Sequence, residues 1–370
     1  MAAITRSVSP LLALLAVAAT VLAVLMSAPV SARSLPEGLP DIKPLLSNPW
    51  SAFQNLSGCQ FGDERQGLAR LKDYLSRFGY LPAPPAKFND MFDADMESAI
   101  RTYQQNFGLE VTGQLDAATV AKMMSPRCGV ADIINGTSAM GKTTVHGRNL
   151  YSYFPGSPSW PRSKKSLRYA ITAATETTID RATLSKVFAS AFARWSAATT
   201  LNFTETASAS DADITIGFHS GDHGDGEAFD GPLGTLAHAF SPTDGRFHLD
   251  ASEAWVAGGD VSRVSLDAAV DLESVAVHEI GHLLGLGHSS VEGAIMYPTI
   301  TSRTQKVELA KDDVDGIQSL YGGNPNFKGV TPPATSSEET HSAAPRALSR
   351  PWSGLAGVAV AAAVAVALSC

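Results

Sequence analysis

The apolar side chains of residues 33–150 recur in three stretches with the spacing of an amphipathic helix. The first stretch ends at Gly79, the second begins with the capping pair Asp93 and Glu97, and the third runs from Asp116 to Met124. The apolar positions of the first two are Leu68, Leu71, Leu75, Phe78, Ile100, Tyr103 and Phe107. We therefore expect a small three-helix bundle in this part of the chain.

Residues 151–324 mix the helical period with the alternation typical of strands. Helices are expected over Arg181 to Ala198, over about Leu272 to Leu284, and around Val314, Ile317 and Leu320. Strands are expected over Leu167 to Ile171, Ile214 to Phe218, Thr235 to Ala239 and Phe247 to Leu249. These elements predict an α+β domain, a mixed twisted sheet with three helices.

The segment from Asp132 to Tyr151, which joins the two parts, is rich in Gly and Thr. We expect it to be exposed, and therefore open to an activating protease.

Two apolar ends flank these domains. Residues 1–32 combine Arg6, an apolar run and the small residues Val30-Ser31-Ala32, the pattern of a secretory signal peptide; the run is short for the alternative, a membrane-spanning anchor. Residues 325–342 are rich in Pro, Ser, Thr and Glu and predict a solvated stalk. In residues 343–370 a spacer and a short apolar tail follow Ser342, as in a GPI-anchor signal; a tail anchor is the alternative.

Charge and cysteine content narrow the class of protein. Charged residues make up 17% of the chain and the net charge is −8, which predicts no nucleic-acid partner. The cysteines, Cys59, Cys128 and Cys370, all lie outside residues 151–324. Glycosylation acceptor patterns begin at Asn55, Asn135 and Asn202. With the two terminal signals, they predict an exported glycoprotein held on the outer leaflet of the plasma membrane by a GPI anchor.

The histidines and the glutamate of residues 278–288 indicate a catalytic metal site. His278 and His282 are four residues apart on an expected helix and can offer two imidazole nitrogens to one metal ion. The third histidine, His288, can reach the same ion only if the chain turns, and Gly285 and Gly287 permit that turn. Zinc with three protein nitrogens keeps its fourth position for water, whose pKa it lowers to roughly 7. Glu279 is then the expected general base of peptide hydrolysis.

The longer pattern of residues 278–288, followed by Ser289 and Met296, resembles the matrix metalloproteinases, or matrixins, of the metzincin clan. The resemblance makes Met296 the Met-turn methionine beneath the zinc ligands. The run Pro126-Arg127-Cys128-Gly129-Val130-Ala131-Asp132 resembles the matrixin cysteine switch, in which Cys128 takes the fourth zinc position of the latent enzyme. Arg127 and Asp132 are expected to form an ion pair. Ala131 stands where proline is usual in the family.

The resemblance implies two further metal sites. A structural zinc would have four protein ligands, His223, Asp225, His238 and His248. Calcium would be bound by oxygen groups of Asp230, Gly231, Leu233, Thr235, Asp250 and Glu253. Asp213 is a candidate for a second calcium, although Arg246 stands where a carboxylate is usual.

The resemblance also describes the substrate and its site. An extended polypeptide would pair with Thr235 to Ala239 as an edge strand, and its side chain after the scissile bond would enter a pocket between Ser274 and the segment Tyr297-Pro298. The small Ser274 predicts a roomy pocket for Leu-like or larger groups. A chain with no room for a hemopexin-like domain resembles the plant-type members.

Two other functions compete with proteolysis. Helical bundles of the kind expected for residues 33–150 also occur as peptidoglycan-binding modules, so wall binding is one alternative. The other is a catalytically inactive cell-surface adhesion protein with a metalloprotease fold. The presence of Glu279 argues against the second alternative, because loss of the general base is the usual route to inactivity.

Overall fold

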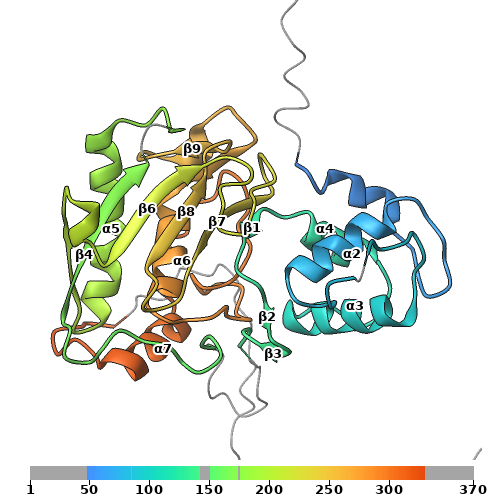
Figure 1. Cartoon of the computed structure of the whole chain (residues 1–370), viewed down its shortest axis with the longest axis horizontal. Coiled ribbons are helices and arrows are strands. Elements are labelled where there is room, and N and C mark those ends of the chain that lie inside the picture. The colour runs from blue at the N-terminus through green and yellow to red at the C-terminus, as the bar shows by residue number, and fades with distance from the viewer. Residues whose placement is uncertain (1–47, 85, 142–150, 174–175, 330–370) are drawn as a thin grey trace, which may run out of the picture. The chain divides into compact units, whose positions relative to one another are not determined.

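The computed structural model describes residues 48–84, 86–141, 151–173 and 176–329 (Figure 1). The expected signal peptide, the GPI-anchor signal with Ser342 and most of the stalk lie outside the described residues. No helix within the described ranges is both long and apolar enough to cross a membrane.

The expected three-helix bundle is confirmed. Its helices are α2 (Leu68–Arg77), α3 (Ala94–Asn106) and α4 (Ala117–Met123), preceded by the 3-10 helix η2 (Ser51–Leu56), which was not expected. Asp93 and Asp116 cap α3 and α4 by accepting from the backbone N–H three residues on, since their carboxylates satisfy amides that have no partner inside the helix. Cys59 is fully buried in the core of this bundle.

Residues 151–173 and 176–329 form a mixed α+β domain, and β1 from the preceding segment joins five of its strands in a six-stranded sheet, in the order β1-β7-β8-β6-β4-β5. The strands are β1 (Arg127–Cys128), β4 (Ser166–Ala173), β5 (Asn202–Glu205), β6 (Ile214–His219), β7 (Thr235–Ala239) and β8 (Arg246–Asp250). Only the β7–β8 pair in this sheet is antiparallel. The short strands β1 and β5 were not expected.

Three helices accompany the sheet, as the periodicity predicts: α5 (Arg181–Ala198), α6 (Leu272–Leu283) and α7 (Lys311–Tyr321) (Figure 1). The buried indole of Trp195 on α5 donates to the Val277 carbonyl on α6 at 2.9 Å, which fixes the two helices against each other. Small elements complete the fold: β2 (Ile133–Ile134), β3 (Thr137–Ser138), β9 (Ala254–Val256), β10 (Ala269–Asp271), η4 (Ala209–Asp211) and η5 (Val261–Arg263).

Two expectations, one about strand β7 and one about the segment from Asp132, need correction. Strand β7 is not a free edge: β1 pairs with it in parallel, and Gly129 N–H donates to the Ala237 carbonyl at 2.7 Å. The linker from Asp132 is not exposed throughout, because Asp132, Ala139 and Met140 are buried. Both departures arise from contacts between segments far apart in sequence, which local patterns do not encode.

Candidate metal centres

Helix α6 presents His278 and His282 one turn apart on the same face. The helix ends at Leu283, and Gly285, two residues further on, has a φ of 102°, which is available to glycine at no steric cost. A Cβ at this position would also lie 2.3 Å from the Pro158 carbonyl oxygen. The expectation that Gly285 turns the chain is therefore confirmed, and the turn returns His288 to the two helical histidines.

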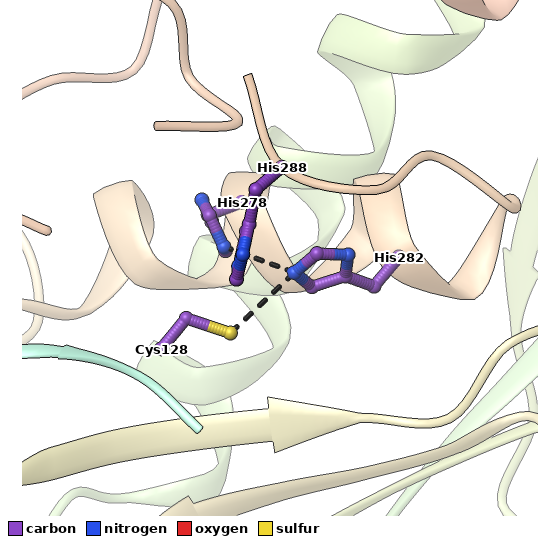
Figure 2. Close-up of side chains that lie close together, drawn as sticks. All are labelled: Cys128, His278, His282 and His288. Carbon is purple, nitrogen blue, oxygen red and sulfur yellow. Dashed lines mark hydrogen bonds between the residues drawn. The ribbon is translucent and has the colours of Figure 1, made fainter. Parts of the chain in front are cut away.

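The three imidazoles and one thiol converge (Figure 2). Nε2 of His278 lies 3.1 Å from Nε2 of His282, and Sγ of Cys128 lies 3.4 Å from the same His282 nitrogen. One ligand atom from each of Cys128, His278, His282 and His288 lies within 4.8 Å of the others, and all four residues are buried. Such a set matches the tetrahedral sulfur and nitrogen coordination that zinc prefers.

The other ring nitrogen of each histidine shows how the protons are arranged. Nδ1 of His278 lies 2.7 Å from the Ile295 carbonyl oxygen, and Nδ1 of His282 lies 2.8 Å from that of Leu286. A carbonyl oxygen only accepts, so each Nδ1 carries the proton and each Nε2 presents a lone pair to the centre. Burial lowers the pKa of both rings and keeps them neutral. Lone pairs 3.1 Å apart repel, and a shared cation removes that repulsion.

The third histidine, His288, is oriented by Asp132. Its Nδ1 donates to Oδ1 of Asp132 at 2.8 Å, while its Nε2 is buried without a hydrogen-bond partner. Burial alone would raise the pKa of Asp132, but Arg127 and His288 outweigh it and lower that pKa to about 2. Asp132 is thus a carboxylate and an acceptor. This buried nitrogen without a hydrogen-bond partner is the observation that best fits a bound metal.

Glu279 lies within the same buried centre. Both of its carboxylate oxygens lack a hydrogen-bond partner, and burial raises its pKa to about 8. Burial and Glu279 together raise the pKa of the Cys128 thiol well above its usual range. A bound zinc ion has the opposite effect on the thiol, because a thiol that coordinates zinc loses its proton. Cys128 is therefore a suitable zinc ligand despite its raised pKa.

A second cluster gathers His223, Asp225, His238 and His248. Oδ2 of Asp225 lies 2.8 Å from Nε2 of His223, from Nε2 of His238 and from Nδ1 of His248. Burial lowers the pKa of His238 to about 4, so that ring is neutral at pH 7. Four protein ligands leave no open position, which is the arrangement of a structural zinc site.

The comparisons with known proteins agree with this geometry. Residues 159–322 match the family model described as matrixin. The chain is 54% identical over 305 residues to metalloendoproteinase 2-MMP of Arabidopsis thaliana, covering 78% of this chain and 80% of that protein. It is 50% identical over 265 residues to metalloendoproteinase 1 of Glycine max, covering 71% and 85%. The chain belongs to the matrixin family.

More distant relatives include matrix metalloproteinase-20 of Homo sapiens, at 41% identity over 234 residues, which are 62% of this chain and 43% of that protein. Residues 64–123 of the matrixin also match the model of a putative peptidoglycan binding domain. This second match covers the helical bundle that the sequence predicts. With the relatives named as metalloendoproteinases, the chain is a zinc endopeptidase of the matrixin type.

The expected calcium ligands of the matrixin do not converge as its zinc ligands do. Among the described residues, only the Cys128 and His223 clusters bring three or more side-chain ligand atoms within 4.8 Å of one another. Even so, Asp250 and Glu253 each keep one buried oxygen without a partner, and burial raises the pKa of Glu253 to about 9. Asp230 and Glu253 accept from the amides of Thr235 and Leu233. Burial therefore disfavours the charged forms of these acids as long as no cation lies beside them.

The structure does not favour a second calcium site at Asp213. Lys164 Nζ forms an ion pair with the Asp213 carboxylate, which also accepts the Arg168 amide at 2.9 Å. Arg246, which stands where a carboxylate is usual, is paired with Asp244 at 2.7 Å. Lys164 thus balances the charge of Asp213, so no bound cation is required there.

Met296 packs against α6, the helix of the matrixin that carries His278 and His282. It is buried, and a Cβ added to Gly281 would lie 2.2 Å from its sulfur. Gly281 lies between His278 and His282, so the methionine supports the backbone that carries both histidines. Asp313 holds the turn in place by accepting the amides of Ile295 and Met296.

The three expected substrate-pocket residues line one pocket beside the centre. They are Ser274, Tyr297 and Pro298, and the pocket also includes His278 and Glu279. Apolar side chains form most of the remaining wall: Leu236, Val275, Ile295 and Ile300. Lys306 lines the same pocket and was missed by sequence reasoning, because no motif marks it.

The three acceptor asparagines are exposed on the matrixin surface. Asn55 lies in η2, Asn135 lies at the β2–β3 turn with a φ of 50°, and Asn202 begins the edge strand β5. Their exposure is compatible with glycosylation.

Proposed function

We propose that this matrixin is a secreted, latent endopeptidase that hydrolyses extracellular proteins, with Glu279 as its general base and Cys128 as its internal inhibitor. The observation that supports this most directly is the convergence of three imidazoles and one thiol beside the buried carboxyl group of Glu279. His278, His282 and His288 would hold the catalytic zinc.

The proposed mechanism needs no covalent intermediate. Zinc, when bound, acts as a Lewis acid that polarises the scissile carbonyl and acidifies the attacking water. Glu279 accepts a proton from that water and later delivers it to the departing amine. A substrate strand would pair with β7 in place of β1.

Latency would rest on the pro-segment, residues 33–150. Cys128 lies against His282 where the water would otherwise bind, and β1 occupies the edge of β7. Arg127 and Asp132 form a 2.7 Å ion pair with both side chains fully buried, and the Arg127 guanidinium lies 3.6 Å above the centre of the Phe78 ring. An activating protease that removes this segment would free both the metal and the strand edge.

Two further metals would stabilise the domain of residues 151–324. His223, Asp225, His238 and His248 would hold a structural zinc. Calcium near Asp230, Asp250 and Glu253 would compensate their buried charge, with backbone oxygens such as those of Gly231, Leu233 and Thr235 completing the six to eight ligands that it takes.

The catalytic proposal is tested on the full chain after proteolytic removal of its pro-segment. Cleavage of internally quenched peptides should fall by about 10²- to 10⁴-fold in Glu279→Ala. Zinc content should stay unchanged, since Glu279 is not a ligand. Equal activity of Glu279→Ala and the unmodified enzyme would refute the mechanism. Inactivity of both, with zinc bound, would favour the adhesion alternative.

Location is tested separately. We propose cleavage after residue 32, GPI attachment at Ser342 after removal of residues 343–370, and a stalk of residues 325–342. Mass spectrometry of both ends of the mature protein would verify these boundaries. Glycosylation at Asn55, Asn135 and Asn202 can be read in the same experiment. The match of residues 64–123 to a putative peptidoglycan binding domain motivates one control, a pull-down of the full chain on isolated cell wall.

A further inference from the structure

Lys306 connects two walls of the substrate pocket. Its backbone N–H donates to Oγ of Ser274 on α6 at 2.7 Å. Its ammonium donates to the Glu292 carbonyl at 2.8 Å and lies 5.6 Å from the centre of the Tyr297 ring. The backbone of Lys306 is therefore held at the α6 side of the pocket and its charged end at the Tyr297 side. The four-carbon stem must run between them.

The Ser274 end of this connection is held rigidly. Asp271, which is almost fully buried, accepts both the amide and the hydroxyl of Ser274 at 2.9 and 2.6 Å. Since the hydroxyl proton points to Asp271, an oxygen lone pair is left to accept Lys306 N–H. The small side chain at position 274 thus leaves room in the pocket and at the same time anchors the residue that fills it.

The rest of the pocket makes the lysine stem a suitable lining. The neighbouring walls are formed by Leu236, Val275, Ile295 and Ile300. A lysine commonly packs its methylene groups along apolar surface while its ammonium reaches a polar partner. Here that partner is the Glu292 carbonyl, at the end of the stem away from Ser274.

We propose that Lys306 limits the depth of this pocket. Its methylene stem forms the floor of the pocket, where the small side chain of Ser274 leaves space. The inference rests on the proposed proteolytic function and names the residue that limits the substrate. The side chain that follows the scissile bond is then of Leu or Met size, and longer aromatic groups are excluded. Ser274 by itself predicts no such limit.

The test compares Lys306→Ala with Lys306→Met in the full chain, after removal of the pro-segment. Two quenched peptides are used that differ only after the scissile bond, one with Leu and one with 4-phenylphenylalanine. The measured quantity is the ratio of their kcat/KM values. Lys306→Ala should raise the ratio of long to short by about 10-fold or more, the scale on which pocket size discriminates. Lys306→Met, which keeps an apolar stem, should leave the ratio near that of the unmodified enzyme.

Lys311→Ala is the matched control, because Lys311 is exposed on α7 and does not line the pocket. Lys306→Ser replaces Lys306→Ala if thermal melting shows the latter to be unfolded. An unchanged ratio in the shortened variant would overturn the inference, and so would an equal rise in Lys306→Met, which would assign the effect to the charge. If the zinc-loaded unmodified enzyme cleaves neither peptide, the proposed function itself fails.

Discussion

Asp132, four residues after Cys128, accepts a hydrogen bond from Nδ1 of the expected zinc ligand His288, at 2.8 Å. The same carboxylate oxygen lies 2.7 Å from the Arg127 guanidinium. All three side chains are fully buried. The ion pair with Arg127 and the orientation of His288 therefore depend on one carboxylate.

Replacing Asp132 by Asn should destabilise the latent form. The substitution leaves the Arg127 charge buried without a partner, which typically costs about 3–5 kcal/mol. Urea unfolding of the zinc-loaded full chain would measure this. Peptide cleavage before any protease is added should rise at the same time. The control is Asp267→Asn, since Asp267 is 97% exposed and pairs with Arg303 at the surface. If Asp132→Asn and Asp267→Asn have the same free energy of unfolding, Asp132 does not stabilise the buried Arg127, and the prediction is wrong.

Gly281→Ala should disturb the support beneath the zinc helix. A Cβ there would lie 2.2 Å from the Met296 sulfur and 3.1 Å from the Trp195 ring, so the core must shift. Overpacking of this kind costs about 1–3 kcal/mol. Thermal melting should show the loss. Gly293→Ala, where a Cβ would meet nothing within 4 Å, should change the melting temperature little. Equal melting of the two variants would contradict the close packing of Met296.

Stability in the absence of calcium should fall as pH rises. Burial raises the folded-state pKa of Glu253 to about 9, above the roughly 4.3 of an unfolded glutamate. The protonated form is therefore the one that folding favours. Its contribution is fully present below pH of about 4, and it is lost as pH rises through about 9.

Calcium should restore that loss, and more strongly at pH 8 than at pH 5, in unfolding measured with zinc present throughout. Glu253→Gln is isosteric and neutral, so its stability without calcium should change less over the same range. A stabilisation by calcium that is equal in Glu253→Gln and the unmodified chain would disprove a site at these acids.

His248→Ala should remove the second zinc but spare the first. The three nitrogens of that cluster meet at one Asp225 oxygen, so loss of one leaves an incomplete ligand set. Metal analysis should show the zinc content falling by about one ion per chain, with a loss of stability because structural zinc binding contributes to folding. His219→Ala is the matched control: its ring stacks on His223, but it is not in the cluster. A loss of zinc in His219→Ala alone would reassign the ligands.

Much of this matrixin could be read from local sequence. The bounds of α5 and β7, the cap Asp93, the start of α4 near Asp116 and the turn at Gly285 were all expected correctly. Each depends on periodicity, capping or backbone freedom within a few residues, so the chain itself carries the signal. The ligand histidines belong here too, because a helical spacing of four already places two of them on one face.

The edge of the sheet and the limits of the pocket came from tertiary contacts alone. Cys128 pairs with Ala237 in strand register, Asp132 reaches His288, and Lys306 crosses from Ser274 to Glu292. The first two pairs join residues more than a hundred positions apart, and no periodic pattern marks any of these contacts. Such partners are chosen by burial and by the need of buried polar groups for hydrogen bonds, and those conditions exist only once the whole domain has folded.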